Sequence, residues 1–482
     1  MLARQVLQYA VARGVPGIAS LVLLMVYTRT LAPQEYGAYA AALAWILLVK
    51  MVIFQWLELS VLRELSTEHG GAADNVVSSA VGLFLILSAI AVPVAAAFAL
   101  GGGLPGGPLF VAAAIASLIG VAWFELQLAV LQKRMQALRY GLLRSARAVF
   151  ECASGFGLVF AGLGASAPML GLLIGVAVAS LVVPGLPWRS LRPRLDPSRV
   201  RSFVAYGLPL TAAVAAGAVM NATDRVMLAS MKGNAAVGLY AAASELAINP
   251  VMLVMMVVNL AAYPLALRAY DRDGRAAAEA QLARNGQFML AAGLPVMMAI
   301  ATLAQDLSAV FLGESFRAGA AVIVPVIGLS AFIGGMRSFV YDLAFQVTKN
   351  TGAQARVLFV TVVVNVALNL ALIDRYGAAG AAFATLLSQA VALSLSALLG
   401  RKLLRVNVAG ADALKVLLAA TLAFGSLLLF DLAADVVGLM SKALASGLGY
   451  LGLLYALNAC GVREHGRQAR EGWLERARAK WS

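Results

Sequence analysis

Charged residues are scarce in this sequence, and their scarcity decides the class of protein. Asp, Glu, Lys and Arg make up 12% of the 482 residues, whereas hydrophobic residues make up 62%. Soluble chains carry about a quarter charged and about half apolar residues. A soluble fold cannot hide this much apolar surface, because its own exterior has to be polar. The composition excludes a soluble enzyme, a secreted disulfide scaffold and a disordered chain, and it predicts a polytopic membrane protein.

Cysteine and histidine are equally rare. Cys152 and Cys460 lie in or at the end of apolar runs, and His69 and His465 lie in polar loops without metal-ligand spacing. The Gly-x-x-x-x-Gly-Lys-[Ser/Thr] phosphate loop is missing, so hydrolysis of ATP by that mechanism is not expected. We predict no metal, no catalytic residue and no bound cofactor, with a proton or sodium gradient as the energy source.

Apolar runs of about 20 residues recur along the whole chain, which is the length that a membrane-spanning helix needs. They lack the polar/apolar alternation of barrel strands and are about twice as long as such strands. We therefore predict an all-α membrane protein with about fourteen spans. The predicted spans are residues 14–31, 37–61, 76–100, 109–132, 142–164, 167–187, 204–230, 235–264, 286–312, 318–345, 356–374, 377–400, 414–432 and 436–460.

The basic residues follow the alternation of the predicted loops. The net charge is +14, with 37 Lys and Arg. With a cytoplasmic amino terminus, about 28 of them fall in inner segments and about four in outer loops. This asymmetry predicts a multi-pass membrane protein with both termini in the cytoplasm, and it accounts for the positive charge without a nucleic-acid partner.

The predicted outer loops are short; residues 101–108, 164–167 and 231–234 are typical. A membrane glycosyl polymerase needs a substantial outer loop that carries catalytic residues. Its absence favours a transporter over a membrane enzyme, and we predict that the protein is not an enzyme.

A weak internal repeat suggests two similar halves. Gly37-Ala38-Tyr39 opens the second predicted span and Gly238-Leu239-Tyr240 opens the eighth. Six helices separate the two copies, so the halves share one orientation, as in a parallel repeat. The predicted domains are an N-lobe (1–187), a cytoplasmic linker (188–203), a C-lobe (204–400), two further helices (401–460) and a basic amphipathic tail (461–482) that lies on anionic lipid.

Several segments resemble one family of transporters. Residues 28–39 (TRTLAPQEYGAY) resemble the first outer hairpin of polysaccharide-biosynthesis flippases, and residues 206–210 (YGLPL), 223–225 (TDR) and 237–240 (VGLY) resemble their seventh and eighth helices. Residues 369–382 (NLALIDRYGAAGAA) resemble the hairpin between their eleventh and twelfth helices. The resemblance places the chain in the multidrug/oligosaccharidyl-lipid/polysaccharide exporter superfamily. It implies two six-helix lobes around a central cavity lined by Arg or Lys, in the bacterial cytoplasmic (inner) membrane, and flipping of undecaprenyl-pyrophosphate-linked sugars from the inner to the outer leaflet.

Positive charges inside the spans are the candidate substrate contacts, because a charge at this depth generally faces protein, water or a partner. Lys50 lies about 20 Å from the outer end of its span. It is predicted to contact the pyrophosphate, with an internal ion pair to Glu58 or Glu125 as the alternative.

Two arginines complete the candidate cavity cations. Arg337 stands five residues before Asp342, which is poor spacing for a pair within one helix, so we expect each to find a partner elsewhere. Arg147 and Glu151 are four residues apart and are predicted to pair, so a structural role is the alternative for this arginine.

Carboxylates in the spans are candidates for ion coupling, since a buried carboxyl can load and release a proton near neutrality. The candidates are Glu125, Glu245, Asp306 and Asp342, and a paired or water-solvated carboxylate is the alternative for each. Asp224 and Arg225 are interpreted as interfacial anchors, and Lys442 near an outer helix end is left open.

The predicted function is a flippase for undecaprenyl-pyrophosphate-linked oligosaccharide, the repeat unit of a surface polysaccharide such as lipopolysaccharide or exopolysaccharide, working by ion-coupled alternating access. Its predicted partners are the lipid-linked oligosaccharide, membrane lipids, and a polysaccharide polymerase and other assembly proteins. A lipid II flippase and a drug/cation antiporter of the same superfamily are alternatives, and a membrane glycosyl polymerase is a weaker one.

Overall fold

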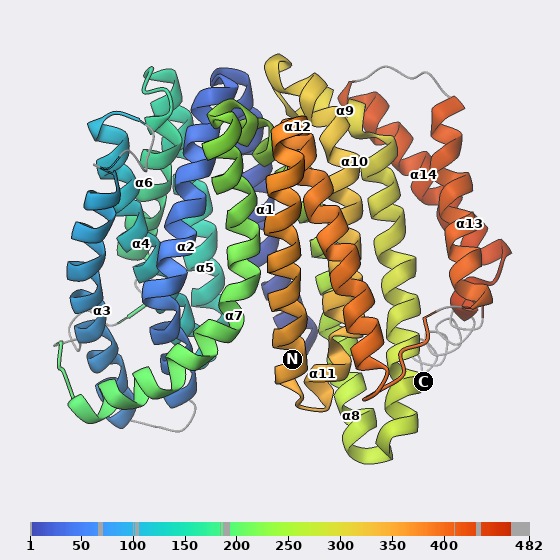
Figure 1. The fold of residues 1–482 in the computed structure, drawn as a ribbon, viewed down its shortest axis with the longest axis horizontal. Helices are drawn as coiled ribbons and strands as arrows, with labels where there is room; N and C mark the ends of the chain where they lie inside the picture. The colour runs from blue at the N-terminus through green and yellow to red at the C-terminus, as the bar shows by residue number, and fades with distance from the viewer. Residues whose placement is uncertain are drawn as a thin grey trace, which may run out of the picture. The chain divides into compact units, whose positions relative to one another are not determined.

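The computed structural model describes residues 2–65, 71–99, 101, 106–183, 185–186, 193–408, 410–429 and 435–463, and every regular element among them is helical (Figure 1). The all-α prediction is confirmed. The elements are α1 (Leu2–Thr30), α2 (Pro33–Glu64), α3 (Gly71–Phe98), α4 (Pro108–Lys133), α5 (Ala137–Phe160), α6 (Ser166–Val182), α7 (Pro197–Lys232), α8 (Asn234–Thr302), α9 (Ala304–Phe311), α10 (Glu314–Met336), η2 (Arg337–Tyr341), α11 (Leu343–Val347), α12 (Thr351–Gly400), α13 (Ala411–Gly425), η3 (Ser426–Leu429), α14 (Val436–Ala456) and η4 (Ala459–Gly461).

Seven helical stretches of the described chain are long and apolar enough to cross a membrane. Two of them reach over two predicted spans each: α8 has 69 residues and covers 235–264 and most of 286–312, and α12 has 50 residues and covers 356–374 and 377–400. At 1.5 Å per residue they measure about 100 Å and about 75 Å, against a hydrocarbon core of about 30 Å. Each turns back at a glycine, Gly274 with φ 80° and Gly377 with φ 54°, a backbone region that other residues rarely adopt. The chain is a polytopic membrane protein.

Short-range sequence signals explain where several helices begin. Pro33 opens α2, and the Glu35 carboxylate accepts the backbone N–H of Ala32 at 3.0 Å. Pro197 opens α7, and the Asp196 side chain accepts the N–H of Ser198 at 3.0 Å. Proline at the first position and an acidic or hydroxyl side chain beside it satisfy N–H groups that have no partner within the helix.

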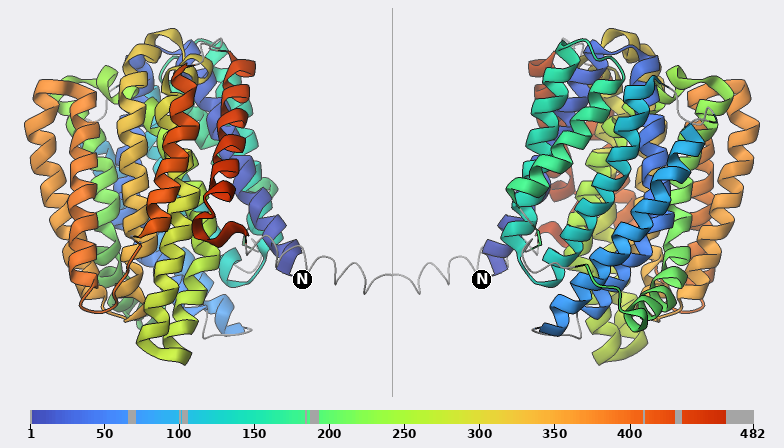
Figure 2. Two further views of the ribbon diagram at one scale, coloured as in Figure 1. Left: turned by 90° about the vertical axis from the view of Figure 1, so that its right-hand side faces the viewer. Right: turned by 90° about the vertical axis from the view of Figure 1, so that its left-hand side faces the viewer.

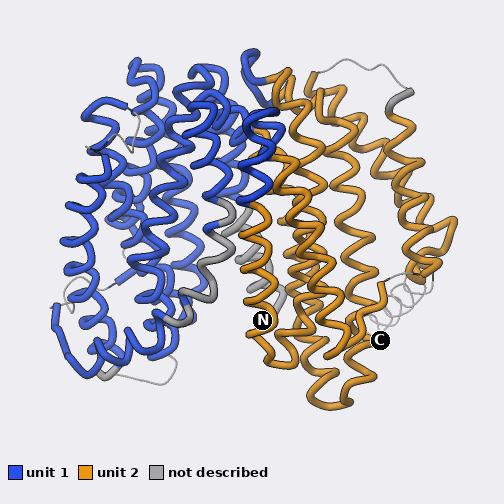
Figure 3. The backbone as a smooth tube through the Cα atoms, viewed as in Figure 1, with its two compact units in different colours: residues 1–242, 311–316, 366–381 blue, residues 243–310, 317–365, 382–482 orange. Residues whose placement is uncertain are grey.

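The chain divides into two compact units (Figure 3). The first comprises residues 1–242, 311–316 and 366–381. Within it, α5 packs on α6 and α1, and α2 packs on α7 and α4. Large side chains that are 1% exposed or less fill its core, among them Phe54, Leu57, Phe124, Leu131 and Phe203.

The second unit comprises residues 243–310, 317–365 and 382–482. Leu343, Ala344 and Leu404 pack with Ala266 and Leu282 in one small core. Helices α13 and α14 form a packed pair (Figures 1 and 2). The predicted lobe and linker boundaries remain a prediction, and the predicted basic tail lies, apart from residues 461–463, outside the described residues.

Outward-facing side chains of the helices are apolar as well. Leu85 and Ile90 on α3 and Leu448 and Leu451 on α14 are each at least half exposed. In water such surfaces would aggregate, whereas against lipid acyl chains they are the expected covering.

Candidate functional site: charges buried in apolar helices

Lys50 is buried in α2 at 8% exposure, and the carboxylate and the amide that its ammonium contacts are on the same helix. Its Nζ lies 2.8 Å from Oε1 of Glu58 and donates to Oε1 of Gln55 at 3.1 Å. The arrangement corresponds to the alternative interpretation of Lys50, an internal ion pair, in which a low-dielectric environment is tolerated because the two charges neutralise each other.

Arg147 pairs with Glu151 across one turn of α5, as its spacing predicts, with Nε 3.3 Å from Oε2. Its guanidinium carbon stands 5.1 Å from the centroid of the Phe124 ring. It borders a hollow of about 290 Å³, which Arg144 and Glu151 also line.

Arg337 and Asp342 pair with each other, so the expectation of separate partners is wrong. Nη1 of Arg337 lies 3.0 Å from Oδ2 of Asp342, and both side chains are buried. The cause is a π-turn, η2, in which the N–H of Asp342 donates to the carbonyl of Arg337 at 2.8 Å. A π-turn brings residues five apart onto the same helix face, which an α-helix does not. Ser396 donates to the other Asp342 oxygen at 2.6 Å.

Asp306 of α9 is tied to Lys442 of α14. Nζ of Lys442 donates to both carboxylate oxygens, at 3.0 Å and 2.9 Å, and both residues are 8% exposed. Tyr450 adds a hydrogen bond from its hydroxyl to the carbonyl of Ala291 at 2.8 Å. These contacts attach α14 to α9 and α8, and the Asp306 carboxylate is charge-neutralised where it lies.

The remaining coupling candidates differ from Asp306 and Asp342. Within the described part of the chain, neither Glu125 nor Glu245 has a Lys or Arg at ion-pair distance. Glu245 accepts a hydrogen bond from Nδ2 of Asn249 at 2.6 Å, one turn along α8. Both carboxyls are half-buried.

Asp224 is the residue that sequence reasoning placed incorrectly. It is 3% exposed and is therefore not an interfacial anchor. Its carboxylate accepts the hydroxyl of Tyr240 at 2.7 Å and Nδ2 of Asn369 at 2.6 Å. All three residues belong to segments that carry the family resemblance, so each could have been selected from the sequence. That the three meet could not be predicted, because Asn369 is far from the other two in the chain.

The two copies of the repeated glycine motif touch each other. A Cβ on Gly37 would overlap the carbonyl oxygen of Asn234, and a Cβ on Gly238 would overlap that of Pro33. The start of α2 and the start of α8 therefore cross at backbone contact, which requires glycine in both. The crossing joins the equivalent ends of the two halves that the repeat predicts.

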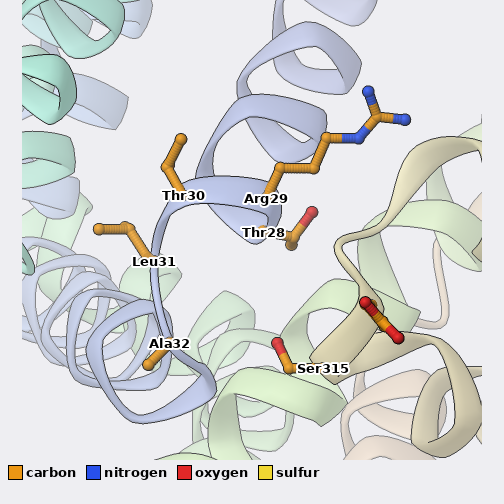
Figure 4. A pocket seen from close by; sticks show the side chains of 7 residues that line it. Thr28, Arg29, Thr30, Leu31, Ala32 and Ser315 are labelled. Atoms are coloured by element: carbon orange, nitrogen blue, oxygen red, sulfur yellow. The ribbon is translucent and has the colours of Figure 1, made fainter.

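A second hollow, of about 510 Å³, lies near the carboxyl end of α1 (Figure 4). Its lining is polar and includes Thr28, Arg29, Glu314 and Ser315. The Thr28 hydroxyl accepts the N–H of Gly313 at 3.1 Å, which fastens the segment before α10 to α1. No group of three or more potential metal ligands is found among the described residues.

The chain shares its fold with a structure described as lipid II flippase MurJ in an inward closed conformation, at 15% identity and a TM-score of 0.77 over 93% of this chain and 98% of that one. A multidrug resistance MATE family transporter of the MOP superfamily, inward-facing, matches at 14% identity and a TM-score of 0.59 over 83% of this chain and 97% of that one.

A MOP superfamily transporter from Pyrococcus furiosus gives a TM-score of 0.58 at 12% identity, over 83% of this chain and 94% of that one. No curated protein sequence matches the chain. The sequence model of the family described as polysaccharide biosynthesis protein matches residues 2–269, more than half of the 482 residues. With this match, and with the fold of these transporters, the chain belongs to the polysaccharide biosynthesis protein family.

Proposed function

We propose that the protein flips undecaprenyl-pyrophosphate-linked oligosaccharide from the inner to the outer leaflet of the cytoplasmic membrane. The observation that carries this proposal is membership of the polysaccharide biosynthesis protein family. The fold shared with flippases and exporters supports translocation over chemistry on the sugar. In this proposal the protein is a transporter and not an enzyme, and its partners are the lipid-linked sugar, membrane lipids and a polymerase that uses the delivered repeat units.

The contacts of the buried charges indicate which residues are candidates for substrate contact and which for ion coupling in this proposal. Lys50 and Arg337 already have carboxylate partners, so each meets an anionic substrate only by exchanging that partner. Arg147 also has a partner but borders open space. For coupling to a proton gradient, Glu125 and Glu245 are better placed than Asp306 and Asp342, since a carboxylate held by a cation releases it only at a cost.

The test is deletion of the gene, followed by measurement of lipid-linked repeat units on each leaflet and of surface polysaccharide. We expect repeat units to accumulate on the cytoplasmic leaflet while surface polysaccharide falls. Restoration by the wild-type gene is the control. Normal surface polysaccharide without accumulation would reject the proposal.

A lipid II flippase is the second candidate, and a specific observation favours it: the likeness to the solved lipid II flippase covers nearly the full length of both chains. Complementation separates the two candidates. If the protein sustains growth of a strain depleted of its own lipid II flippase, the cargo is lipid II. If it does not, while its deletion removes a surface polysaccharide, the first proposal stands.

A further inference from the structure

The buried pair of Arg337 and Asp342 leaves one donor of the arginine unused. Nη1 of Arg337 lies 3.0 Å from Oδ2 of Asp342, and Nη2 donates to the hydroxyl of Ser338 at 3.2 Å. Nε of Arg337 is buried and has no hydrogen-bond partner among the described residues. A buried donor without an acceptor costs free energy and is rare in folded proteins. The present partners therefore do not satisfy the whole guanidinium.

An unused acceptor lies close by, on the neighbouring helix α12. Gln389 is 9% exposed, and its Oε1 is also buried without a hydrogen-bond partner in the described part of the chain. A Cβ added to Gly334 would stand 3.3 Å from Cδ and 3.4 Å from Oε1 of Gln389, so the amide lies directly against this glycine. Gly334 is one helical turn before Arg337, and all these residues belong to the second unit. An unused donor and an unused acceptor thus lie near each other.

The π-turn η2 determines which way the Arg337 side chain is directed. In a regular α-helix, long side chains point back toward the amino terminus and cover positions three and four residues earlier. For Arg337 the position three residues earlier is Gly334, which has no side chain to fill the space beside Gln389. The π-turn instead brings Asp342 onto the face of Arg337. On a regular α-helix the spacing of five residues separates this pair, and the arginine is directed toward Gln389.

We propose that Arg337 has two alternative partners: Asp342 while η2 is a π-turn, and the amide oxygen of Gln389 once η2 continues as a regular α-helix. Asp342 keeps the hydroxyl of Ser396, 2.6 Å away, in both states. A bare carboxylate is costly in a low-dielectric interior, so Asp342 carries a proton in the second state. Gln389 lowers the cost of separating Arg337 from Asp342, which is the step that a role of Asp342 in ion coupling requires. That role rests on the proposed function, whereas the exchange of partners is a property of the protein alone.

The experiment compares the effect of Gln389→Leu on the apparent Tm of the detergent-solubilised full-length protein in two backgrounds. In the wild type the buried amide oxygen has no partner, so its replacement is expected to leave the Tm unchanged or to raise it. Asp342→Asn keeps the side-chain shape and removes the charge that holds Arg337, so the arginine is expected to bind Gln389. In this background Gln389→Leu removes a hydrogen bond and is expected to lower the Tm by about 2 °C.

Glu58→Gln provides the matched control background, because it neutralises the carboxylate of another buried ion pair, that of Lys50 in the first unit. There Gln389→Leu is expected to behave as it does in the wild type. If the fall in Tm is missing from the Asp342→Asn background, or is as large in the wild type or in the Glu58→Gln background, Arg337 does not move to Gln389 and the proposal is overturned.

A second variant keeps the test decisive if Asp342→Asn alone is too unstable to purify. Gln389→Glu places a carboxylate at the second position, so the double variant Asp342→Asn, Gln389→Glu is expected to rebuild the ion pair there and to regain a Tm near that of the wild type. Asp342→Asn, Gln281→Glu is its control, since it adds a carboxylate elsewhere in the same unit. No recovery, or equal recovery in both, contradicts the proposal. The gene-deletion test uses none of these variants, so the proposed function stands or fails separately.

Discussion

Several charged residues in this protein form ion pairs, and the sequence separation between the two partners differs from pair to pair. Lys50 takes its partner from two turns away on its own helix, and Arg147 from one turn away. Lys442 takes its partner from a helix more than a hundred residues distant in sequence. In the two lysine pairs, which are buried, the removal of one partner is expected to cost more than the removal of both, because an unpaired charge then remains in a low-dielectric interior.

Replacement of Lys50 tests this directly. Lys50→Met leaves Glu58 buried without its cation and is expected to cost about 3 kcal/mol of stability. The double variant Lys50→Met, Glu58→Gln has no buried charge at this position and is expected to recover most of the loss. The apparent Tm of each detergent-solubilised variant measures the effect. Equal losses in the single and double variants would mean that the ion pair does not stabilise the fold.

Glu279 gives a pH-dependent prediction outside the predicted spans. The backbone N–H of Arg405 and then the guanidinium of Arg275 hold the pKa of Glu279 below its ordinary value of 4.5. A lowered folded-state pKa means that the stabilisation is present above about pH 4.5 and is lost as the pH falls through the folded-state pKa.

Glu279→Gln should therefore lower the Tm at neutral pH, and the difference from the wild type should shrink as the pH falls below about 4.5. Asp271→Asn, which removes an exposed carboxyl from the same hairpin, serves as the control. A difference that stays constant across this range would show that the charge of Glu279 is not what joins the hairpin to Arg405.

Two local features of the helices decide which faces meet. The π-turn η2 places Arg337 and Asp342 on one face, and the glycines at the starts of α2 and α8 let two regular helices cross at backbone contact. Neither feature changes the hydrophobicity of the segment, so a search for apolar runs detects neither of them. Each feature acts on a whole helix, because it determines which face of that helix packs against its neighbours.

The glycine crossing predicts a large response to one methyl group. Gly37→Ala places Cβ against backbone atoms of Asn234, which cannot turn away as a side chain can, and overpacking of this kind costs about 1–3 kcal/mol. Gly157→Ala on α5 is the matched control, because nothing lies within 4 Å of its added Cβ. We expect the Tm to fall for the first and to stay or rise for the second. An equal Tm for the two variants would show that the close backbone contact at Gly37 does not limit stability.

For the whole molecule, the positive-inside distribution predicts which side each loop faces. In a Cys152→Ser, Cys460→Ser background, Gly107→Cys is expected to react with a membrane-impermeant maleimide on intact cells. Asp273→Cys is expected to react only after the cells are permeabilised. Both positions are exposed, so access to the reagent depends on the side of the membrane. Labelling of Asp273→Cys in intact cells would show that this loop faces outward and that the predicted topology is wrong.

The amino-acid sequence by itself determined that the chain is helical, crosses a membrane many times and pairs Arg147 with Glu151. Hydrophobicity and helical spacing are local properties, so both can be detected within a window of about 20 residues of sequence. The resemblance of short segments pointed to the family for the same reason, since each motif is contiguous.

Only the tertiary structure decided which distant groups meet. Asp224 and Asn369 are 145 residues apart in sequence, and Asp306 and Lys442 are 136 apart. Nothing local links the members of either pair, because their meeting depends on how helices pack. The pairing of Arg337 with Asp342 is close in sequence but depends on a π-turn, because the spacing of five residues does not bring the two side chains together on a regular α-helix.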